Sequence, residues 1–300
     1  MSGCWERQIN QSGLLKIKIG IYMNEELNKL LTVIIPVKNE ETNLPQCLEG
    51  IKGLLNVVIV DSGSDDATCK IAADYGREVV QFKWNGMFPK KRNWILRNYK
   101  FKTPWVMFLD ADERPDAKFW EELARTLPNT KHDVFIIYLN NWFLGRLLRH
   151  GDTPRKTAIV RLGRAEYERI EEQGWSKLDM EIHEHLVTDG TVGRIKTPIA
   201  HYDKRSLSSY YVKHNEYSDW ESRRYLALKD YKTGLTFRQR VKYRMFMSKL
   251  LPLGYFAYTY ICKLGFLDGA PGYYFAVNKF NQFTQLQAKV YEQLHVTGQR

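Results

Sequence analysis

Cysteine is scarce in this sequence: only Cys4, Cys47, Cys69 and Cys262 occur among its 300 residues. Four cysteines are too few for a disulfide scaffold, and no two of them form a CxxC pair. These absences argue against a disulfide-stabilised domain and against a cysteine-based zinc or redox site. We therefore expect a cytoplasmic protein with a large hydrophobic core, for which a hydrophobic content of 44% is ample.

The sequence also lacks a hydrophobic run long enough to cross a membrane. Its uncharged stretch Leu250–Cys262 has 13 residues, whereas a spanning helix needs about 20. This stretch is predicted to lie in a membrane interface without crossing it. The N-terminus shows no charged start followed by an apolar run and a cleavage site, so no signal peptide is expected. Residues 1–28 are predicted to be a poorly ordered extension.

Acidic residues are few relative to basic ones, which gives a net charge of +11. Most of the excess lies in residues 201–300, with 16 Lys and Arg against 7 Asp and Glu. There the spacing of Phe237, Val241 and Met245 predicts an amphipathic helix with a cationic flank over 238–249. RNA-binding, helix-turn-helix and zinc-finger patterns are missing, so no nucleic-acid partner is expected. An anionic membrane surface explains the same composition.

Short apolar runs alternate with helical patterns in the first half of the sequence. The β-branched run of Leu31–Glu40 ends in polar residues, and Asn56–Thr68 repeats this arrangement. A helix is predicted between them over Thr42–Leu54, and further strands over Val79–Phe82 and Pro104–Glu113. This order predicts a doubly wound α/β sheet that binds its ligand at the carboxyl ends of the strands.

The predicted catalytic domain extends to residue 205. Val134–Gly145 and Thr157–Leu162 are predicted to be further strands, and an edge position in the sheet is expected for the first. A helix is expected over Lys118–Leu127. Residues 29–205 would then form the catalytic domain, and residues 206–300 a basic, aromatic and helical region that contacts membrane and acceptor.

An acidic cluster closes the predicted strand Pro104–Glu113. Because side chains alternate along an extended chain, Asp110 and Asp112 are expected to point the same way, with Glu113 following. Two carboxylates on one side favour a divalent cation that prefers oxygen ligands, Mg²⁺ or Mn²⁺. A solvated acidic turn is the open alternative for these residues.

Three motifs precede this cluster: IIPVKNE, VDSGSDDAT and KRN at Lys91–Asn93. In this order, over about Leu31–Asp116, the sequence resembles family 2 glycosyltransferases. The resemblance implies a GT-A fold, a Rossmann-like mixed sheet flanked by helices, here followed by a C-terminal helical amphipathic extension. It also implies a divalent metal, Mg²⁺ or Mn²⁺, and a nucleotide-sugar donor, with a UDP-sugar favoured.

The resemblance further implies roles for individual residues. A carboxylate can accept a hydrogen bond from a uracil imide, and a lysine can meet phosphate charge. The residues alone leave open that Asp61 and Asp65 are helix caps and that Lys91 and Arg92 are solvated charges. By resemblance, the nucleoside is surrounded by Pro36, Asn39, Glu40 and Asp61, with Asp61 meeting the base; Lys91 approaches the donor; and Asp110 and Asp112 hold the metal.

The second half carries a narrower resemblance. The stretches Trp142–Leu162, Glu181–Ile195, Ala200–Tyr202 and Gly265–Ala276 look like the bacterial branch that adds glucose to the lipopolysaccharide inner core through a β-1,4 linkage to heptose. This implies an inverting transfer of glucose to a lipopolysaccharide core or other lipid-linked acceptor, by a peripheral enzyme on the inner face of the cytoplasmic membrane. A polyprenyl-phosphate or exopolysaccharide acceptor is the alternative, and an inactive membrane-binding protein is the alternative of another class.

Inversion needs a base that takes the proton of the acceptor hydroxyl. Glu184 in the IHEH motif is predicted to be this base, with Glu181 and Asp179 as competitors. His183 is predicted either to complete the metal site or bind the diphosphate, or to be a packed residue.

Three other side chains receive weaker predictions. His201 is expected to be structural. Arg149 and Arg161 are candidates for acceptor recognition, although solvated arginines are the simpler interpretation.

Overall fold

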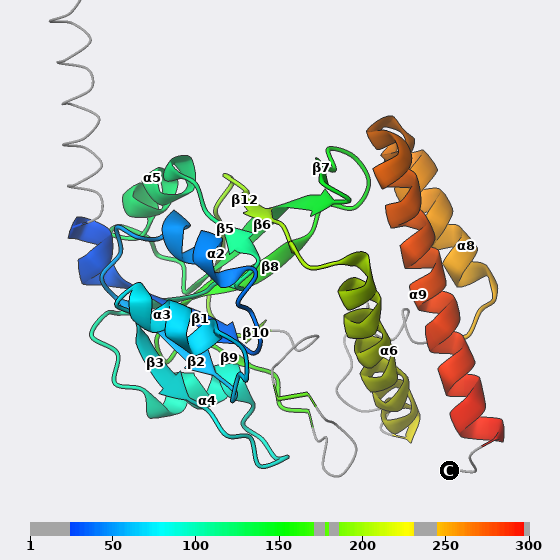
Figure 1. Cartoon of the computed structure of the whole chain (residues 1–300), viewed down its shortest axis with the longest axis horizontal. Helices are drawn as coiled ribbons and strands as arrows, with labels where there is room; N and C mark the ends of the chain where they lie inside the picture. The colour runs from blue at the N-terminus through cyan, green and yellow to red at the C-terminus, as the bar shows by residue number, and fades with distance from the viewer. Residues whose placement is uncertain (1–24, 171–177, 180–185, 231–244, 297–300) are drawn as a thin grey trace, which may run out of the picture. The chain divides into compact units, whose positions relative to one another are not determined.

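The computed structural model describes residues 25–170, 178–179, 186–230 and 245–296 (Figure 1). These residues form two compact units. Of the described residues, the first unit holds those up to Leu139 and those in 155–170 and 179–203. The second holds Asn140–Pro154, residue 178 and the residues from Lys204 onward.

Four parallel strands form one half of the sheet in the first unit. The central strand β1 (Leu31–Val37) is buried along its whole length. It pairs in parallel with β2 (Val57–Asp61) and with β4 (Trp105–Phe108), and β3 (Glu78–Gln81) extends the sheet beyond β2. Continuous burial of β-branched residues is typical of parallel strands covered on both faces, which is how these runs were interpreted from the sequence.

The other half of the sheet is mainly antiparallel. β8 (Arg155–Arg161) pairs with β4, and β6 (Val134–Phe143) pairs with β8. The strand order is β3-β2-β1-β4-β8-β6-β12-β5, with β7 and β11 also on β6. The predicted edge position of β6 is therefore wrong, because β6 has partners on both sides. The remaining strands are β5 (Glu113–Arg114), β7 (Arg146–Leu147), β11 (Val192–Arg194) and β12 (Ile199–His201), and β9 (Glu166–Tyr167) and β10 (Leu186–Val187) form a separate pair.

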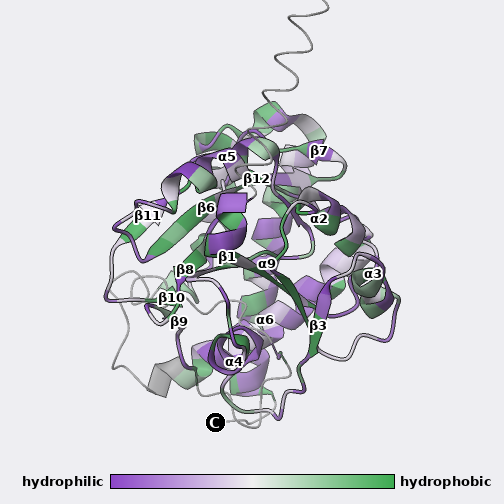
Figure 2. Cartoon of the chain, turned by 90° about the vertical axis from the view of Figure 1, so that its left-hand side faces the viewer, coloured by the Kyte–Doolittle hydropathy of each residue, from purple (hydrophilic) through white to green (hydrophobic). Residues whose placement is uncertain are grey.

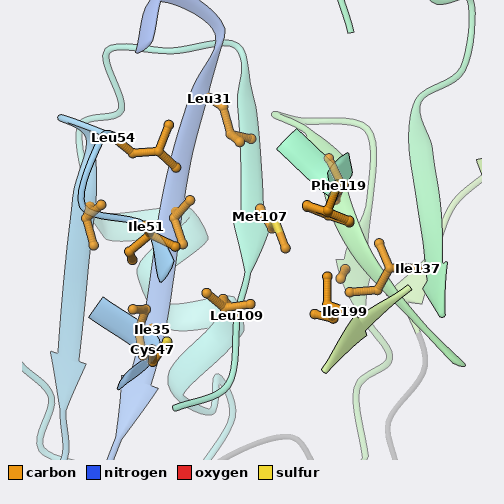
Figure 3. Close-up of a cluster of buried hydrophobic side chains, with 14 of the residues drawn as sticks. Leu31, Ile35, Cys47, Ile51, Leu54, Met107, Leu109, Phe119, Ile137 and Ile199 are labelled. Carbon is orange, nitrogen blue, oxygen red and sulfur yellow. The ribbon is translucent and has the colours of Figure 1, made fainter. Parts of the chain in front are cut away.

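Helices cover both faces of this sheet, and side-chain alternation along β1 separates two cores. Val33, Ile35 and Val37 face the larger core, whereas Ile34 faces the smaller one. The larger core is shown in Figure 3, and the strands that border it are largely hydrophobic in Figure 2. It includes residues of α2 (Leu44–Gly50), α3 (Thr68–Asp74) and α5 (Ala117–Thr126), while α4 (Lys91–Asn98) supplies Ile95 to the smaller core.

Two sequence-based boundaries are corrected by the structure. The helix predicted over Thr42–Leu54 is limited to Leu44–Gly50. The strand predicted to reach Glu113 ends at Phe108, where the chain turns and the Glu113 amide donates to the Asp110 carbonyl at 2.9 Å. Asp110 and Asp112 therefore lie in a turn, and their expected alternation along an extended strand is wrong.

The cap proposed for α3 is also corrected. The Asp66 carboxylate, rather than that of Asp65, accepts the Thr68 amide at 2.9 Å in the first turn of this helix. The Asp65 amide instead donates to the Asn39 side chain. The shift by one residue shows that Asp65 is part of a loop contact and does not cap the helix.

The second unit is a helical assembly, as predicted for the C-terminal extension. α6 (Leu207–Asp230) and α8 (Leu250–Phe256) both pack along α9 (Gly269–His295) (Figure 1). α8 continues as a π-helix over Ala257–Cys262, and a 3₁₀ turn over Gly265–Asp268 leads into α9. The predicted cationic helix over 238–249 lies largely outside the described residues.

The described helices were compared with the length and composition of a membrane span. No single one of them is long and apolar enough to cross a bilayer. The pair formed by Leu250–Cys262 and Gly265–His295, bent by 69°, satisfies these criteria when taken together.

Candidate active site

Three loops meet at the carboxyl edge of the parallel strands. Val37 at the end of β1 lies in register with Asp61 at the end of β2, and Asp61 with Gln81 of β3. β4 runs parallel to β1, so Asp110, two residues past the end of β4, emerges at the same edge. The structure thus gathers the predicted nucleoside and metal residues of these strands along one edge, where doubly wound sheets bind ligands.

Asp61 is buried and organises the turn that follows β2. Its carboxylate accepts the Gly63 amide at 3.0 Å, the Ser64 amide at 3.1 Å and the Ser64 hydroxyl at 2.5 Å. Burial alone would raise the pKa of Asp61, but the hydrogen bonds from Ser64 hold it below its ordinary value. Asp61 is therefore ionised at neutral pH and rigidly placed.

Asn39 joins the loop after β1 to the loop after β2. Its backbone adopts a positive φ of 55°, a conformation that asparagine tolerates better than most residues. Its amide donates to the Ser64 hydroxyl at 2.9 Å, and its side-chain oxygen accepts the Asp65 amide at 3.0 Å. Pro36, the neighbouring predicted residue, is buried within β1 opposite Val60.

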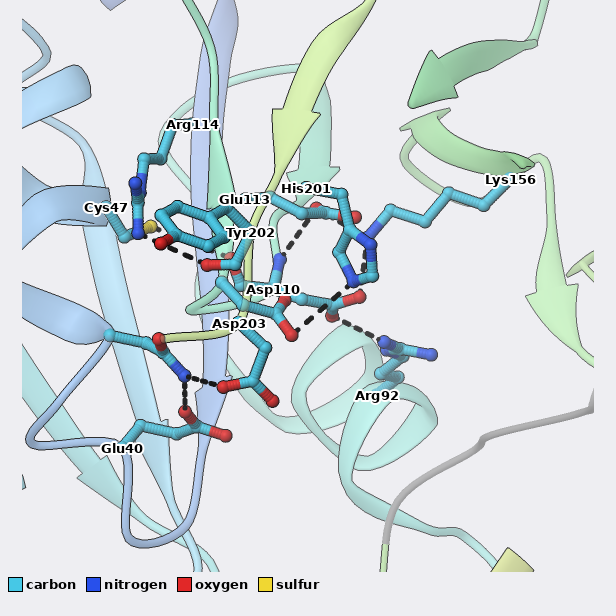
Figure 4. A network of polar contacts seen from close by, with 12 residues as sticks. Glu40, Cys47, Arg92, Asp110, Glu113, Arg114, Lys156, His201, Tyr202 and Asp203 are labelled. Atoms are coloured by element: carbon cyan, nitrogen blue, oxygen red, sulfur yellow. Dashed lines mark hydrogen bonds and ion pairs between the residues drawn. The ribbon is translucent and has the colours of Figure 1, made fainter. Parts of the chain in front are cut away.

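Glu40 lies at the start of a second chain of polar contacts (Figure 4). Its carboxylate accepts the Asn43 side-chain amide at 2.9 Å, and the same amide donates to Asp203 at 3.0 Å. The Glu40 backbone amide donates to the Thr68 hydroxyl at 2.8 Å. These contacts tie the loop after β1 to the segment that follows β12.

Lys91 begins α4 and is only 2% exposed. Its ammonium donates to the Val37 carbonyl at 3.0 Å and lies 3.3 Å from the Asp179 carboxylate. Burial lowers the pKa of Lys91, and Asp179 partly opposes this. The expectation of a solvated lysine is therefore wrong, since Lys91 is a buried cation at the carboxyl end of β1.

Asp110 is held between two cations. Its Oδ1 lies 2.8 Å from Arg92 Nη2, and its Oδ2 lies 2.8 Å from Lys156 Nζ (Figure 4). Burial would raise the pKa of Asp110, but Lys156 and Arg92 lower it to about 2. Arg92 is itself buried, with its guanidinium 5.3 Å from the centre of the Tyr167 ring, so it is not a solvated charge.

Glu113 is almost fully buried and shares Lys156 with Asp110. Its Oε2 lies 2.7 Å from Lys156 Nζ and accepts the Asp110 amide at 2.9 Å. Burial raises the pKa of Glu113 to about 7, although Lys156 opposes this. Asp110 and Glu113 in turn raise the pKa of Lys156, which burial alone would lower. Lys156 therefore stays charged at physiological pH.

Asp112 faces the histidine that ends β12. Its Oδ2 lies 3.5 Å from His201 Nε2, because antiparallel pairing places His201 opposite Glu113. Burial would lower the pKa of His201, but Asp112 raises it to about 9. The imidazole is thus protonated at neutral pH. Three carboxylates, Asp110, Asp112 and Glu113, are balanced in this cluster by three cations, Arg92, Lys156 and His201.

The donor atoms of this cluster are of the type that a divalent cation prefers. Carboxylate oxygens are the ligands that Mg²⁺ and Mn²⁺ prefer, and the buried Glu113 Oε1 has no hydrogen-bond partner among the residues that the structure describes. Both Asp110 oxygens lie on cations, and one Asp112 oxygen lies 3.5 Å from His201. Among the described residues no group of three or more His, Cys, Asp or Glu is arranged as a metal site. His183, the predicted third ligand, lies outside them.

One predicted residue, Arg161, lies away from this edge. Arg161 lies opposite Trp105 at the amino end of β4, where it donates to the Thr130 carbonyl at 3.2 Å. These contacts favour a structural role for Arg161 over acceptor recognition. Arg149 belongs to the second unit. The predicted base Glu184 and its competitor Glu181 lie outside the described residues, whereas Asp179 contacts Lys91.

The sequence analysis did not identify Lys156 as a site residue, and it assigned His201 only a structural role. Ile159 of β8 pairs with Met107 of β4. Lys156 lies three residues before Ile159, and Asp110 lies three residues after Met107. Extending this antiparallel register brings Lys156 opposite Asp110. The only signal was a lysine at the start of an apolar strand, which has no meaning until the pairing of β4 with β8 is known.

Comparison with known proteins agrees with this architecture. The chain is 28% identical over 203 residues to the lipopolysaccharide core biosynthesis glycosyltransferase LpsC of Rhizobium meliloti (strain 1021), covering 63% of this chain and 68% of that protein. It is 23% identical to the uncharacterized glycosyltransferase RC0292 of Rickettsia conorii (strain ATCC VR-613 / Malish 7), covering 67% and 72%.

Solved structures are more distant. Staphylococcus aureus TarS 1–349 has a TM-score of 0.40 at 16% identity, covering 88% of this chain and 91% of that one. Glucosyl-3-phosphoglycerate synthase from Mycobacterium tuberculosis, in complex with Mn²⁺, UDP-glucose and phosphoglyceric acid, has a TM-score of 0.31 at 21% identity, covering 41% and 47%.

The family assignment rests on the model named Glycosyl transferase family 2, which matches residues 32–183. This match spans just over half of the chain and includes strands β2 to β9 and all of β1 except Leu31. The predicted family and GT-A fold are confirmed, and the chain belongs to glycosyl transferase family 2.

Proposed function

We propose that this glycosyltransferase moves a hexose, with glucose favoured, from a UDP-sugar to the core of a lipopolysaccharide, with inversion and with a divalent metal. The observation that carries the proposal is the charged cluster after β4, where Asp110, Asp112 and Glu113 meet Lys156 and His201 at the ligand-binding edge. Buried carboxylates and cations in such number are costly to hold together, which favours a role in handling a charged ligand.

The nucleotide end of the donor would lie over the loops after β1 and β2. Asp61 is ionised there, and Asn39 and Ser64 hold the two loops together. Lys91 places a buried positive charge beneath this edge. Together these residues would orient a nucleoside and its diphosphate.

Asp112, with help from Asp110, would hold Mg²⁺ or Mn²⁺, which supplies positive charge to the departing nucleotide diphosphate. Arg92 and Lys156 keep Asp110 ionised and fixed. His201 brings a further positive charge beside Asp112. The chain's own side chains would thus fix the acidic turn that the diphosphate approaches.

The acceptor half of the proposal rests on the similarity to LpsC, whose name assigns it to lipopolysaccharide core biosynthesis. Glu184 is the favoured base, with Glu181 as its competitor. Asp179 is less favoured, because its backbone carbonyl and carboxylate both contact Lys91. An enzyme of this kind would work at the inner face of the cytoplasmic membrane.

The direct test is donor binding. Purified protein is titrated with UDP-, GDP- and dTDP-sugars, with and without Mn²⁺, and wild type is compared with Asp112→Asn. Asp74→Asn, an exposed site at the end of α3, is the matched control. The proposal expects metal-dependent binding of a UDP-sugar that Asp112→Asn loses by at least about 100-fold and Asp74→Asn retains.

Other outcomes separate the alternatives. Folded protein that binds none of these sugars would indicate an inactive membrane-binding protein. Donor binding followed by transfer to a polyprenyl-phosphate acceptor, and not to lipopolysaccharide core, would favour the alternative acceptor.

A further inference from the structure

Large apolar side chains are unusually exposed where α8 turns into α9. Leu250, Leu253, Ile261, Leu267 and Tyr274 are each more than half exposed. They fall within 25 residues, here named the apolar hairpin (Leu250–Tyr274), whose tip is drawn at the top of the α8 and α9 pair in Figure 1. Single exposed apolar residues are normal on a protein surface, but a group of them marks a site of contact with another apolar phase.

Charge is nearly absent from the apolar hairpin. Its only ionisable acidic or basic side chains are Lys263 and Asp268, and Asp268 is 4% exposed and turned inward. The exposed charge is therefore that of Lys263, whose ammonium lies 5.5 Å from the centre of the Tyr258 ring. Apolar residues flanked by tyrosine and lysine are typical of a segment that lies at the interface of an anionic bilayer.

The backbone is tightly packed at the bend of the hairpin. A Cβ on Gly265 would lie 2.7 Å from the Thr259 carbonyl oxygen, and one on Gly272 would lie 2.1 Å from the Gly265 carbonyl oxygen. The two arms therefore approach backbone to backbone, with Leu264 in a left-handed conformation at the turn. These contacts form only when the two helices are bent against each other. The bend is therefore part of the folded hairpin, and the two helices do not form one straight spanning helix.

Asp268 connects the apolar hairpin to another segment of the same unit. Its carboxylate accepts the Arg149 amide at 3.1 Å and the His150 amide at 2.9 Å, and lies 3.2 Å from His150 Nδ1. The loop that carries Arg149, a predicted acceptor residue, is therefore hydrogen-bonded to the hairpin.

We infer that the apolar hairpin inserts its tip into the headgroup layer of an anionic lipid bilayer without crossing it. Insertion would bring a lipid-linked acceptor to the loop of Arg149 at the membrane surface, a consequence that rests on the proposed function. A second copy of the chain is the competing occupant. Two-fold pairing centred on the tip would place Lys263 of both copies close together, whereas anionic lipid complements that charge.

The experiment is flotation of the full chain with vesicles of phosphatidylcholine and phosphatidylglycerol in equal parts. Ile261→Glu/Leu267→Glu alters two exposed tip residues. Leu55→Glu/Val212→Glu, at sites elsewhere that are at least as exposed, is the control with the same change in charge. The tip variant is expected to lower vesicle binding at least about tenfold, and the control to change it less than about twofold. Equal loss in both variants would overturn insertion in favour of simple charge attraction.

A second measurement reads insertion without disturbing the fold. Cys262 at the tip is an exposed free thiol, and an environment-sensitive fluorophore attached to it should shift to the blue on adding the same vesicles. Cys262→Ser reports labelling of other cysteines. No shift, or a vesicle-independent dimer that the tip variant converts to a monomer, would overturn the inference.

The two proposals fail separately. The tip variant should retain metal-dependent binding of UDP-sugar in solution, whereas Asp112→Asn should lose it and still float with vesicles. Vesicle binding without donor binding would therefore leave insertion standing and sink the proposed donor chemistry.

Discussion

The charged cluster after β4 and the apolar hairpin distribute polarity in opposite ways. In the cluster, Glu113 is buried, Asp110 and Lys156 are partly buried, and Lys156 pairs with both carboxyl groups. In the hairpin, Ile261 and Leu267 are each more than half exposed. Each arrangement is unfavourable by itself, so each indicates a function. Buried charges must be paired within the fold, whereas exposed apolar groups can be covered only by an external partner.

This difference predicts that the cluster is sensitive to the loss of a single member. Lys156→Met should lower the free energy of unfolding by about 3–5 kcal/mol, because it leaves Asp110 and Glu113 close together without their shared cation. Urea denaturation measures the loss. Lys83→Met, at an exposed lysine, is the control and should change it by less than about 0.5 kcal/mol.

A double variant sharpens this result. Adding Glu113→Gln to Lys156→Met should recover part of the lost stability, since it removes one of the two carboxylates that repel each other. If the two changes were additive, the shared role of Lys156 would be contradicted.

Within the hairpin, the sensitive feature is the backbone rather than the exposed side chains. Gly272→Ala should destabilise the protein by about 2–3 kcal/mol, because its Cβ would meet the Gly265 carbonyl oxygen at 2.1 Å. Gly254→Ala in α8 has nothing within 4 Å of the added Cβ and should be neutral or stabilising by up to about 1 kcal/mol. Thermal unfolding followed by circular dichroism compares the two, and equal effects would contradict the tight bend.

The tie between the hairpin and the Arg149 loop should depend on pH. Burial would raise the pKa of Asp268, but the amides of His150 and Arg149 lower it below its ordinary value. A lowered pKa in the folded state stabilises the protein above the unfolded pKa of about 3.9 and loses this effect as the pH falls through the folded value.

Asp268→Asn should accordingly cost about 1–2 kcal/mol at pH 7, and the difference from wild type should shrink below about pH 4. Urea denaturation at pH 7, 5 and 3 measures this. Asp74→Asn is the control, and a constant difference at all three values would show that Asp268 acts through its shape rather than its charge.

The smallest effect is expected at Arg161, which contacts Thr130 and Trp105 far along β8 from Lys156. Arg161→Met should change the KM for the acceptor by less than about twofold and the stability by about 1 kcal/mol or less. Arg149→Met is the comparison, and a larger rise in KM at Arg161 than at Arg149 would revive its predicted role in acceptor recognition.

Much of the first unit could be predicted from local pattern. β1 and β2 are continuous apolar runs followed by Gly, Asn and Asp turns, which identify buried parallel strands in any context. The motifs after these strands led to Asn39, Asp61 and Asp110, and the structure brings all three to one edge. The edge placement of β6 failed because apolar content does not reveal how many partners a strand has.

The charged cluster was only half predictable. Asp110 and Asp112 stand out in the sequence because they follow an apolar run, but the geometry that joined them was misjudged, since β4 ends at Phe108. Their partners could not be found, because Lys156 and His201 reach them through β8 and β12, which pair over long sequence separations.

The sequence by itself determined the alternation of strands and helices, the family, and the shortage of charge in the apolar hairpin, because hydrophobic period and turn chemistry act between residues close in the chain. Only the tertiary structure decided which cations neutralise Asp110, which carboxylate raises the pKa of His201, and that Asp268 turns inward to hold the Arg149 loop. Those contacts depend on strand register and on the bend of a helix pair, which are set by packing across the whole unit.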